Sequence, residues 1–259
     1  MAEKENSAFR LHRFIERMLS QPQNIPTMEV LVNACGVKKS HDVWSQNELV
    51  LRIASLLFAE LHSLKEESRR AGFTAKSLEP IEAAFGKLGV SGLAIQWQHN
   101  SPVFKSCLTP LHIFGEGLAD EGTPVSKADL TDLQDSVSNL RENVQKSDLR
   151  ADVKNFVYEQ LDIIERAINN YPLVGMKAFR AAVREGMFHE AEHMEIVTEL
   201  QKAPQMPSLQ AIVAKVAKWS GYAMLVSRLL SAGEKAEKGV QALAPHAHHI
   251  GLWIRHLLN

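Results

Sequence analysis

The chain has 259 residues, enough to bury one large helical core or two smaller ones. Its net charge of −1 gives no overall electrostatic basis for binding nucleic acid, and 45% hydrophobic with 23% charged residues is ordinary for a globular protein. The two cysteines, Cys35 and Cys107, form no C-x-x-C pair, so reduced thiols are expected. The first residues lack the apolar core of a signal peptide, and we expect a cytoplasmic protein.

Nearly every segment has the apolar spacing of a helix, and none alternates like a strand. We therefore expect an all-α fold, a multi-helix bundle. A compact N-terminal helical region is predicted over residues 1–118 and a C-terminal bundle of longer helices over residues 126–259. The polar stretch 119–125 between them contains Gly122 and Pro124 and is the best candidate for a linker, although one continuous domain is the alternative.

The N-terminal region begins with a helix over about residues 8–20 and a short helix that Gly36 closes. Ser45 and Glu48 have the spacing of a capping box, which predicts the start of a long helix that ends at Gly72. Its buried face is expected to hold Leu49, Ile53, Leu56, Leu57, Leu61 and Leu64. Two short helices are predicted between Val103 and Leu118.

The C-terminal region opens with a helix that Ser126 caps. Its apolar residues have heptad spacing: Leu130, Leu133, Val137, Leu140 and Val144. This row favours packing on an antiparallel neighbour within the chain, with a second subunit as the alternative. Further helices are expected over about 149–169, ended by Tyr171-Pro172, over 173–201, over 208–232 and over 250–258.

One stretch within residues 149–184 resembles a group of uncharacterised all-helical bacterial proteins. The residues that carry the likeness are Leu161, Ile163, Ile164, Arg166, Ala167, Ile168, Tyr171, Gly175 and Phe179. The resemblance implies an all-α fold and no particular activity.

The one chemical motif is His189-Glu190-Ala191-Glu192-His193, an H-E-x-x-H string. In zinc hydrolases such histidines, four residues apart on a helix, bind the metal and the glutamate acts as general base. His189 and His193 are therefore candidate zinc ligands and Glu190 a candidate catalytic base. The charged Glu192 inside the motif and the lack of an evident third ligand instead favour two structural histidines on the flank of a helix. Glu190 falls on the apolar face of that helix, where it needs exposure or a partner.

The expected helix 208–232 is apolar on most sides, which favours a central position in the bundle. Residues 201–259 carry seven basic and two acidic residues, and Trp219, Tyr222 and Trp253 are candidate interaction residues. Residues 208–258 therefore suit, as an alternative, contact with a membrane surface.

Three function hypotheses follow. The leading one is a non-catalytic helical interaction or regulatory module that acts through a protein partner or through self-association, without a cofactor. The second is a zinc-dependent hydrolase that uses His189, Glu190 and His193. The third is a membrane-associating effector that works through residues 208–258. No nucleic-acid partner is expected under any of them.

Overall fold

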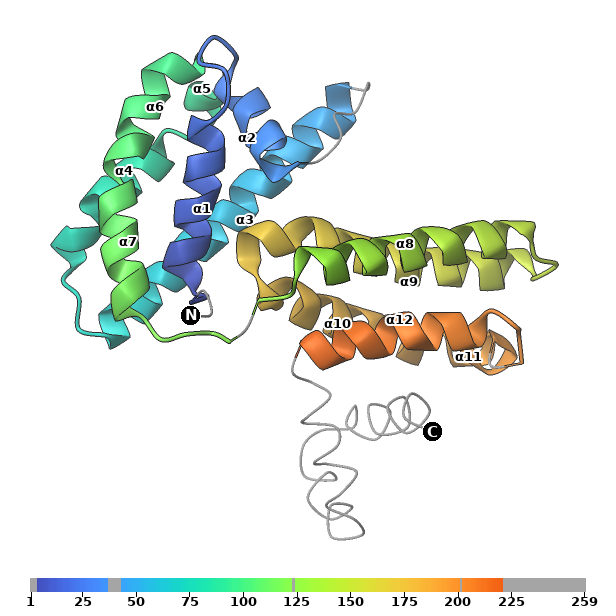
Figure 1. The fold of residues 1–259 in the computed structure, drawn as a ribbon. Helices are drawn as coiled ribbons and strands as arrows, with labels where there is room; N and C mark the ends of the chain where they lie inside the picture. Colours follow the sequence, from blue (N-terminus) through green and yellow to red (C-terminus); the bar gives the residue numbers. More distant parts are fainter. Residues whose placement is uncertain (1–3, 37–42, 123, 201, 221–259) are drawn as a thin grey trace, which may run out of the picture. The chain divides into compact units, whose positions relative to one another are not determined.

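The computed structural model describes residues 4–36, 43–122, 124–200 and 202–220, and its regular structure there is helical (Figure 1). The prediction of an all-α multi-helix bundle is confirmed. Within the described residues, an isolated bridge between Pro26 and Gln96 is the only strand-like pairing.

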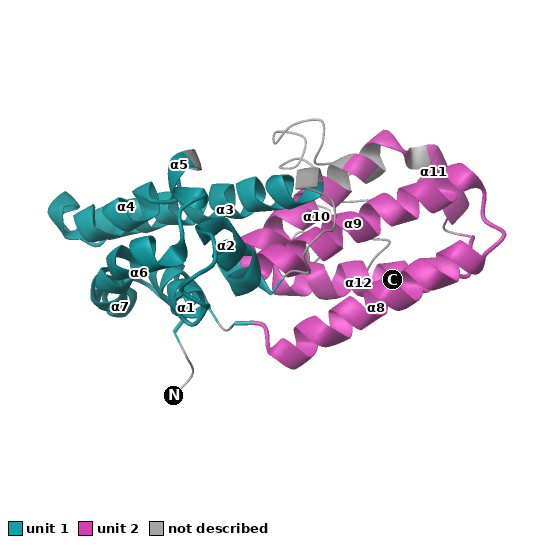
Figure 2. Cartoon of the chain, turned by 90° about the horizontal axis from the view of Figure 1, so that it is seen from above, with its two compact units in different colours: residues 1–124, 172–175 teal, residues 125–171, 176–259 magenta. Residues whose placement is uncertain are grey.

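The chain forms two compact units (Figure 2). Unit 1 comprises Met1–Pro124 with Pro172–Gly175, and unit 2 comprises Val125–Tyr171 with Met176–Asn259. The chain therefore passes between units after Pro124, after Tyr171 and again after Gly175. The expected linker contains the first passage. No sequence pattern had indicated the brief return of residues 172–175 to unit 1.

Unit 1 is built around its first helix, α1. Its elements are α1 (Ser7–Leu19), α2 (Thr27–Cys35), α3 (Val43–Arg70), the 3₁₀ turn η1 (Ala75–Leu78), α4 (Glu79–Gly86), α5 (Val90–Leu93), α6 (Trp97–Ser106) and α7 (Leu108–Gly117). Helix α1 contacts α2, α3, α6 and α7, and its apolar residues Leu11, Phe14 and Ile15 are fully buried. Burial of each such side chain contributes about 1.5–3 kcal/mol, which makes α1 the centre of this core.

Unit 2 is a bundle of five described helices, although the longest described helix, the 28-residue α3, lies in unit 1. The five helices are α8 (Lys127–Lys146), α9 (Ala151–Val174), α10 (Met176–Glu192), α11 (Met194–Leu200) and α12 (Met206–Trp219). Ser126 caps α8, since its Oγ accepts from the amide of Asp129 at 3.0 Å. The heptad row of α8 is buried within the chain at Leu133, Val137, Leu140 and Val144, as the intramolecular interpretation predicted.

Pro172 does not end α9, contrary to the prediction. The helix continues through it to Val174, and the turn into α10 comes at Gly175, which has the left-handed φ of 58°. A proline costs one backbone hydrogen bond in a helix. Here it lies in the last turn, and the burial of Leu173 and Val174 offsets that loss.

Other predicted helix boundaries are also wrong, since α6, expected to start near Val103, begins at Trp97 and contains Pro102. Helix α3 begins at Val43, so Ser45 and Glu48 lie inside its first turns and do not form the expected capping box. The helix expected over 173–201 is divided, because α10 ends at Glu192 and α11 begins at Met194. The H-E-x-x-H string therefore spans a helix break at His193.

Candidate functional site

His189 lies on α10 and contacts α9 with both of its ring nitrogens. Nε2 is 2.6 Å from a carboxylate oxygen of Glu159, and Nδ1 is 2.8 Å from the amide nitrogen of Gln160. A carboxylate only accepts, so Nε2 donates to Glu159, and in that tautomer Nδ1 accepts from the amide of Gln160. Both nitrogens are thus engaged, and zinc would have to displace one of these hydrogen bonds.

Aromatic packing surrounds the same imidazole. The ring of Phe156 on α9 stacks on His189 with a centroid distance of 5.0 Å and an interplanar angle of 12°. His193 meets His189 edge-on at 4.7 Å and Phe156 at 5.9 Å. The structure therefore brings the two predicted histidines together, in a packed cluster between α9 and the end of α10.

The remaining ligand for a metal is not found in the described part of the chain. No group of three His, Cys, Asp or Glu side chains there is arranged to hold a metal ion. The side chain of Glu190, the predicted catalytic base, lies outside what the structure describes. The metal hypothesis thus rests on two histidines, one of which, His189, already pairs with the carboxylate of Glu159.

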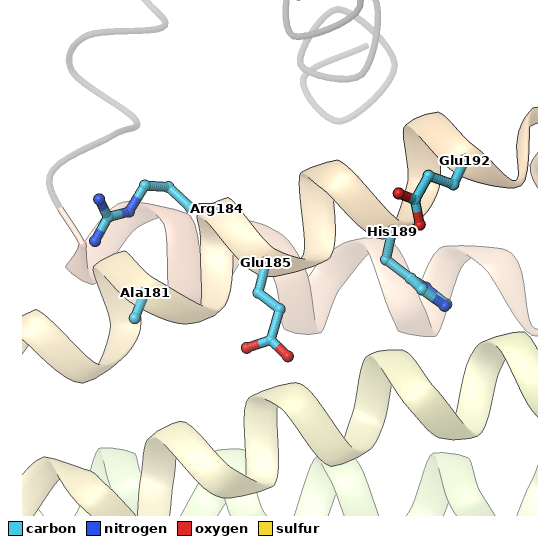
Figure 3. A pocket seen from close by; sticks show the side chains of 5 residues that line it. All are labelled: Ala181, Arg184, Glu185, His189 and Glu192. Atoms are coloured by element: carbon cyan, nitrogen blue, oxygen red, sulfur yellow. The ribbon is translucent and has the colours of Figure 1, made fainter. Parts of the chain in front are cut away.

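An open groove follows α10 beside this cluster. It is lined by Ala181, Arg184, Glu185, His189 and Glu192 (Figure 3). Glu185 is paired across to Arg166 of α9 at 2.8 Å. Arg184, Glu185 and Glu192 are charged, so the described lining is that of a charged surface.

Trp219 is the one predicted interaction residue that lies in the described residues; Tyr222 and Trp253 lie outside them. Its indole packs against Phe179 of α10 with a centroid distance of 5.3 Å. The ammonium of Lys215 lies 5.4 Å from its ring centroid, a cation–π geometry. These contacts join α12 to α10 inside unit 2. No helix among the described residues is long and apolar enough to cross a membrane.

Sequence analysis missed a buried ion cluster around Arg10 of α1. The guanidinium is 1% exposed and binds Glu60 of α3, Glu5 and, at 2.8 Å, Glu121. Burial opposes the charge of Arg10, but hydrogen bonds and attraction from Glu121 and Glu60 outweigh it and raise its pKa. Such a cluster is visible only in three dimensions, because its carboxylates come from three separated parts of the chain.

Residues of the expected linker 119–125 bind to the Arg10 cluster of unit 1. The amide of Glu121 donates to the carbonyl of Glu5 at 2.7 Å, and Oδ1 of Asp120 accepts from the amide of Glu5 at 3.0 Å. Hydrogen bonds from the amides of Glu5 and Gly122 lower the pKa of the Asp120 carboxyl. Residues 120–122 thus form part of unit 1.

Among the described residues of unit 1, α3 carries the most exposed large hydrophobic side chain. Leu51 is 60% exposed and Phe58, two turns further on, is 42% exposed. They belong to an exposed row with alternating spacings of three and four residues, which we call the α3 seam: Glu48, Leu51, Ser55, Phe58, His62 and Lys65. The buried face of α3 is formed by other residues, among them Ile53, Leu57 and Leu64. This second row was the missed signal in the sequence.

The α3 seam is bordered by α4 at its C-terminal half. Phe58 meets Phe85 edge-on at 6.5 Å, and Lys65 pairs with Glu82 at 2.5 Å. The other two large exposed hydrophobics among the described residues, Ile95 and Ile113, lie on other segments. Single exposed apolar residues are normal on a protein surface, whereas two that share one helix face form a patch.

A comparison with protein-family models, with curated proteins and with solved structures finds no match for this chain.

Proposed function

We propose that the protein is a non-catalytic helical interaction module whose contact surface is the α3 seam. The observation that carries the proposal is the exposure of Leu51 and Phe58 on one face of a 28-residue helix. Seven residues separate them, so they stand about 10 Å apart along the axis. That spacing matches the apolar positions through which one helix packs along another.

The geometry of the histidine cluster supports the choice of a non-catalytic role. Both ring nitrogens of His189 are hydrogen-bonded to α9, so a metal ion would have to displace one of these contacts. Catalysis of hydrolysis needs an activated water or nucleophile held beside the substrate. The α3 seam, by contrast, needs only a complementary helix.

The occupant that we assign to the α3 seam is an amphipathic helix. A helix partner meets Leu51 and Phe58 with its own apolar row and leaves Glu48 and Lys65 at the ends of the contact for ion pairs. The single small residue at the centre, Ser55, gives room for a larger side chain. This is the pattern of polar ends and an apolar middle that protein interfaces share.

Photo-cross-linking of the full chain tests the proposal. A photoreactive residue in place of Ser55 is expected to join the chain to one defined helical segment, mapped by mass spectrometry. Leu51→Asp in the same chain is expected to remove that adduct. A probe in place of Ile113, which is 57% exposed on α7, is the matched control. The proposal is contradicted if the probe at position 55 gives no adduct, or if the probes at positions 55 and 113 give the same adduct in equal yield.

A further inference from the structure

The order of residues along the α3 seam is self-complementary. A two-fold axis that crosses α3 midway between Leu56 and Leu57 exchanges Glu48 with Lys65, Leu51 with His62, and Ser55 with Phe58. Two copies of α3 that run antiparallel about this axis therefore place unlike members of the row opposite each other in every layer. An isologous dimer interface requires this relation between a surface and itself.

Each layer of such a pair is favourable in size or charge. The ring of Phe58 meets the small side chain of Ser55 of the second copy, so a large residue fills the space beside a small one. Leu51 packs on the imidazole of His62 of the second copy. At both ends Glu48 meets Lys65 of the second copy, which gives two symmetry-related ion pairs. A parallel pair would instead place Glu48 against Glu48 and Lys65 against Lys65.

The intramolecular partners of the end residues leave these ion pairs available. Within the described residues Glu48 makes no ion pair, and Lys65 pairs only with Glu82. That pair is exposed on both sides, with side-chain exposures of 47% and 40%, and exposed pairs are weak. In the dimer Lys65 lies between Glu82 of its own chain and Glu48 of the second copy, so the existing contact need not break.

The residues at the edge of the α3 seam also fit this two-fold axis. Arg52, Ala59 and Glu66 follow one another at intervals of seven residues, and all three are at least partly exposed. In an antiparallel helix pair this edge faces the same edge of the partner. About the same axis Arg52 lies nearest in height to Ala59 of the second copy, and this small residue leaves room for the long arginine side chain.

Resting on the proposed function, we infer that the partner of the α3 seam is a second copy of this chain, bound antiparallel through α3. The contact spans about five helical turns on each copy, which is short of the roughly 1,600 Å² that standard interfaces bury. We therefore expect a reversible dimer in the micromolar range or weaker.

Sedimentation equilibrium of the full chain over a range of concentrations measures the association. Leu51→Asp is expected to raise the dissociation constant roughly a hundredfold, because it removes the apolar contact from both symmetry-related Leu51–His62 layers. Ile113→Asp is the matched control, since Ile113 is exposed to a similar extent on α7, and it should leave association unchanged. Circular dichroism verifies that both variants remain folded.

Charge reversal tests the antiparallel register. Glu48→Lys alone and Lys65→Glu alone each turn two attractive pairs into two repulsive ones and should weaken the dimer about tenfold, whereas the double variant should restore it. An unchanged dissociation constant for Glu48→Lys would indicate a parallel pair, in which one like-charge contact replaces another, and would overturn the inference. So would a chain that stays monomeric at all concentrations, or a dimer that Leu51→Asp leaves intact.

Different results would contradict the dimer and the interaction module. A monomeric chain that still cross-links from position 55 to a helix of another protein overturns the dimer and leaves the interaction module. A dimer that forms without the α3 seam, together with no adduct from position 55, overturns both.

Discussion

Gly175 faces the buried side chain of Arg10, so that a Cβ added to Gly175 would stand 2.9 Å from Nη1 of Arg10. Gly175 joins α9 to α10 and has a φ of 58°, in the left-handed region. Two independent constraints therefore require glycine here: the backbone conformation and the nearby guanidinium. Because Arg10 is held by Glu60, Glu5 and Glu121, it cannot move aside without disturbing that cluster.

Gly175→Ala is expected to lower the free energy of unfolding by about 2–4 kcal/mol, from about 1–2 kcal/mol of left-handed strain plus about 1–2 kcal/mol of crowding. Gly72→Ala is the matched control, since Gly72 has a φ of 82° with nothing within 4 Å of the added Cβ. Gly72→Ala should lower the free energy of unfolding only by the left-handed strain. Urea unfolding measures both variants. Equal losses would show that Arg10 yields to the methyl group without cost.

Acid is expected to break the hydrogen bond between the Glu5 amide and the Asp120 carboxylate, which we call the Asp120 anchor. The depressed pKa of Asp120 means that its hydrogen bond with the amide of Glu5 stabilises the fold above the ordinary value of 3.8 and is lost as the pH falls through the lower folded pKa. The titration of the carboxyl, followed by NMR, should thus have its midpoint below 3.8. Asp120→Asn should remove the accompanying shift of the Glu5 amide. A midpoint at or above 3.8 would contradict the anchor.

The buried faces of these helices were predictable because burial on one side imposes a periodicity of 3.6 on the sequence. Ile53, Leu57 and Leu64 on α3 illustrate this, and all three are buried. The end of α9 was not predictable in the same way. Proline usually stops a helix, but tertiary packing of Leu173 and Val174 carried the helix past Pro172, and only the fold supplies that packing.

The candidate sites, like the helices, have features that the sequence predicted and features that it did not predict. The sequence predicted His189 and His193 as neighbours on a helix face, and they are in contact. It did not predict Glu159 and Gln160 as the partners of His189, because they lie on another helix about thirty residues earlier. The α3 seam was hidden for the opposite reason: a stronger apolar row on the other side of the same helix dominated the pattern.

The two thiols are expected to react slowly in the native protein. Burial raises the pKa of Cys35 and of Cys107 to about 12, from an ordinary value of 9.0, so roughly a thousandfold less thiolate is present near neutral pH. Alkylation by iodoacetamide at pH 8, located by mass spectrometry, should be slow at both sites and fast in denaturant. Fast alkylation of either thiol in the native chain would contradict its raised pKa.

The neighbouring arginines distinguish Cys35 from Cys107. Positive charge on Arg17 and Arg52 lowers the Cys35 pKa against the larger effect of burial. Arg17→Met should therefore raise that pKa further and slow the alkylation of Cys35 at pH 9–10, with Cys107 unchanged as the internal control. If Arg17→Met slows the alkylation of both thiols equally, the substitution has changed the structure generally. If it speeds the alkylation of Cys35, it has opened the structure locally.

The histidine cluster yields a prediction that separates a structural role from a metal site. His189→Leu keeps an apolar contact with Phe156 but leaves the buried amide of Gln160 without the imidazole, which should cost about 1–3 kcal/mol of unfolding free energy. His193→Leu, in the same cluster, should cost less than about 1 kcal/mol, because its contacts with Phe156 and His189 are ring contacts.

Excess zinc is expected to leave the melting temperature unchanged in the parent chain and in both variants, since the ring nitrogens of His189 are already hydrogen-bonded to α9. Thermal melts with zinc and with a chelator measure this. A ligand that binds only the folded state raises the melting temperature in proportion to its binding free energy. A rise with zinc that both leucine variants abolish would therefore favour the hydrolase hypothesis over a structural pair, and Glu190→Gln would then separate loss of catalysis from loss of metal.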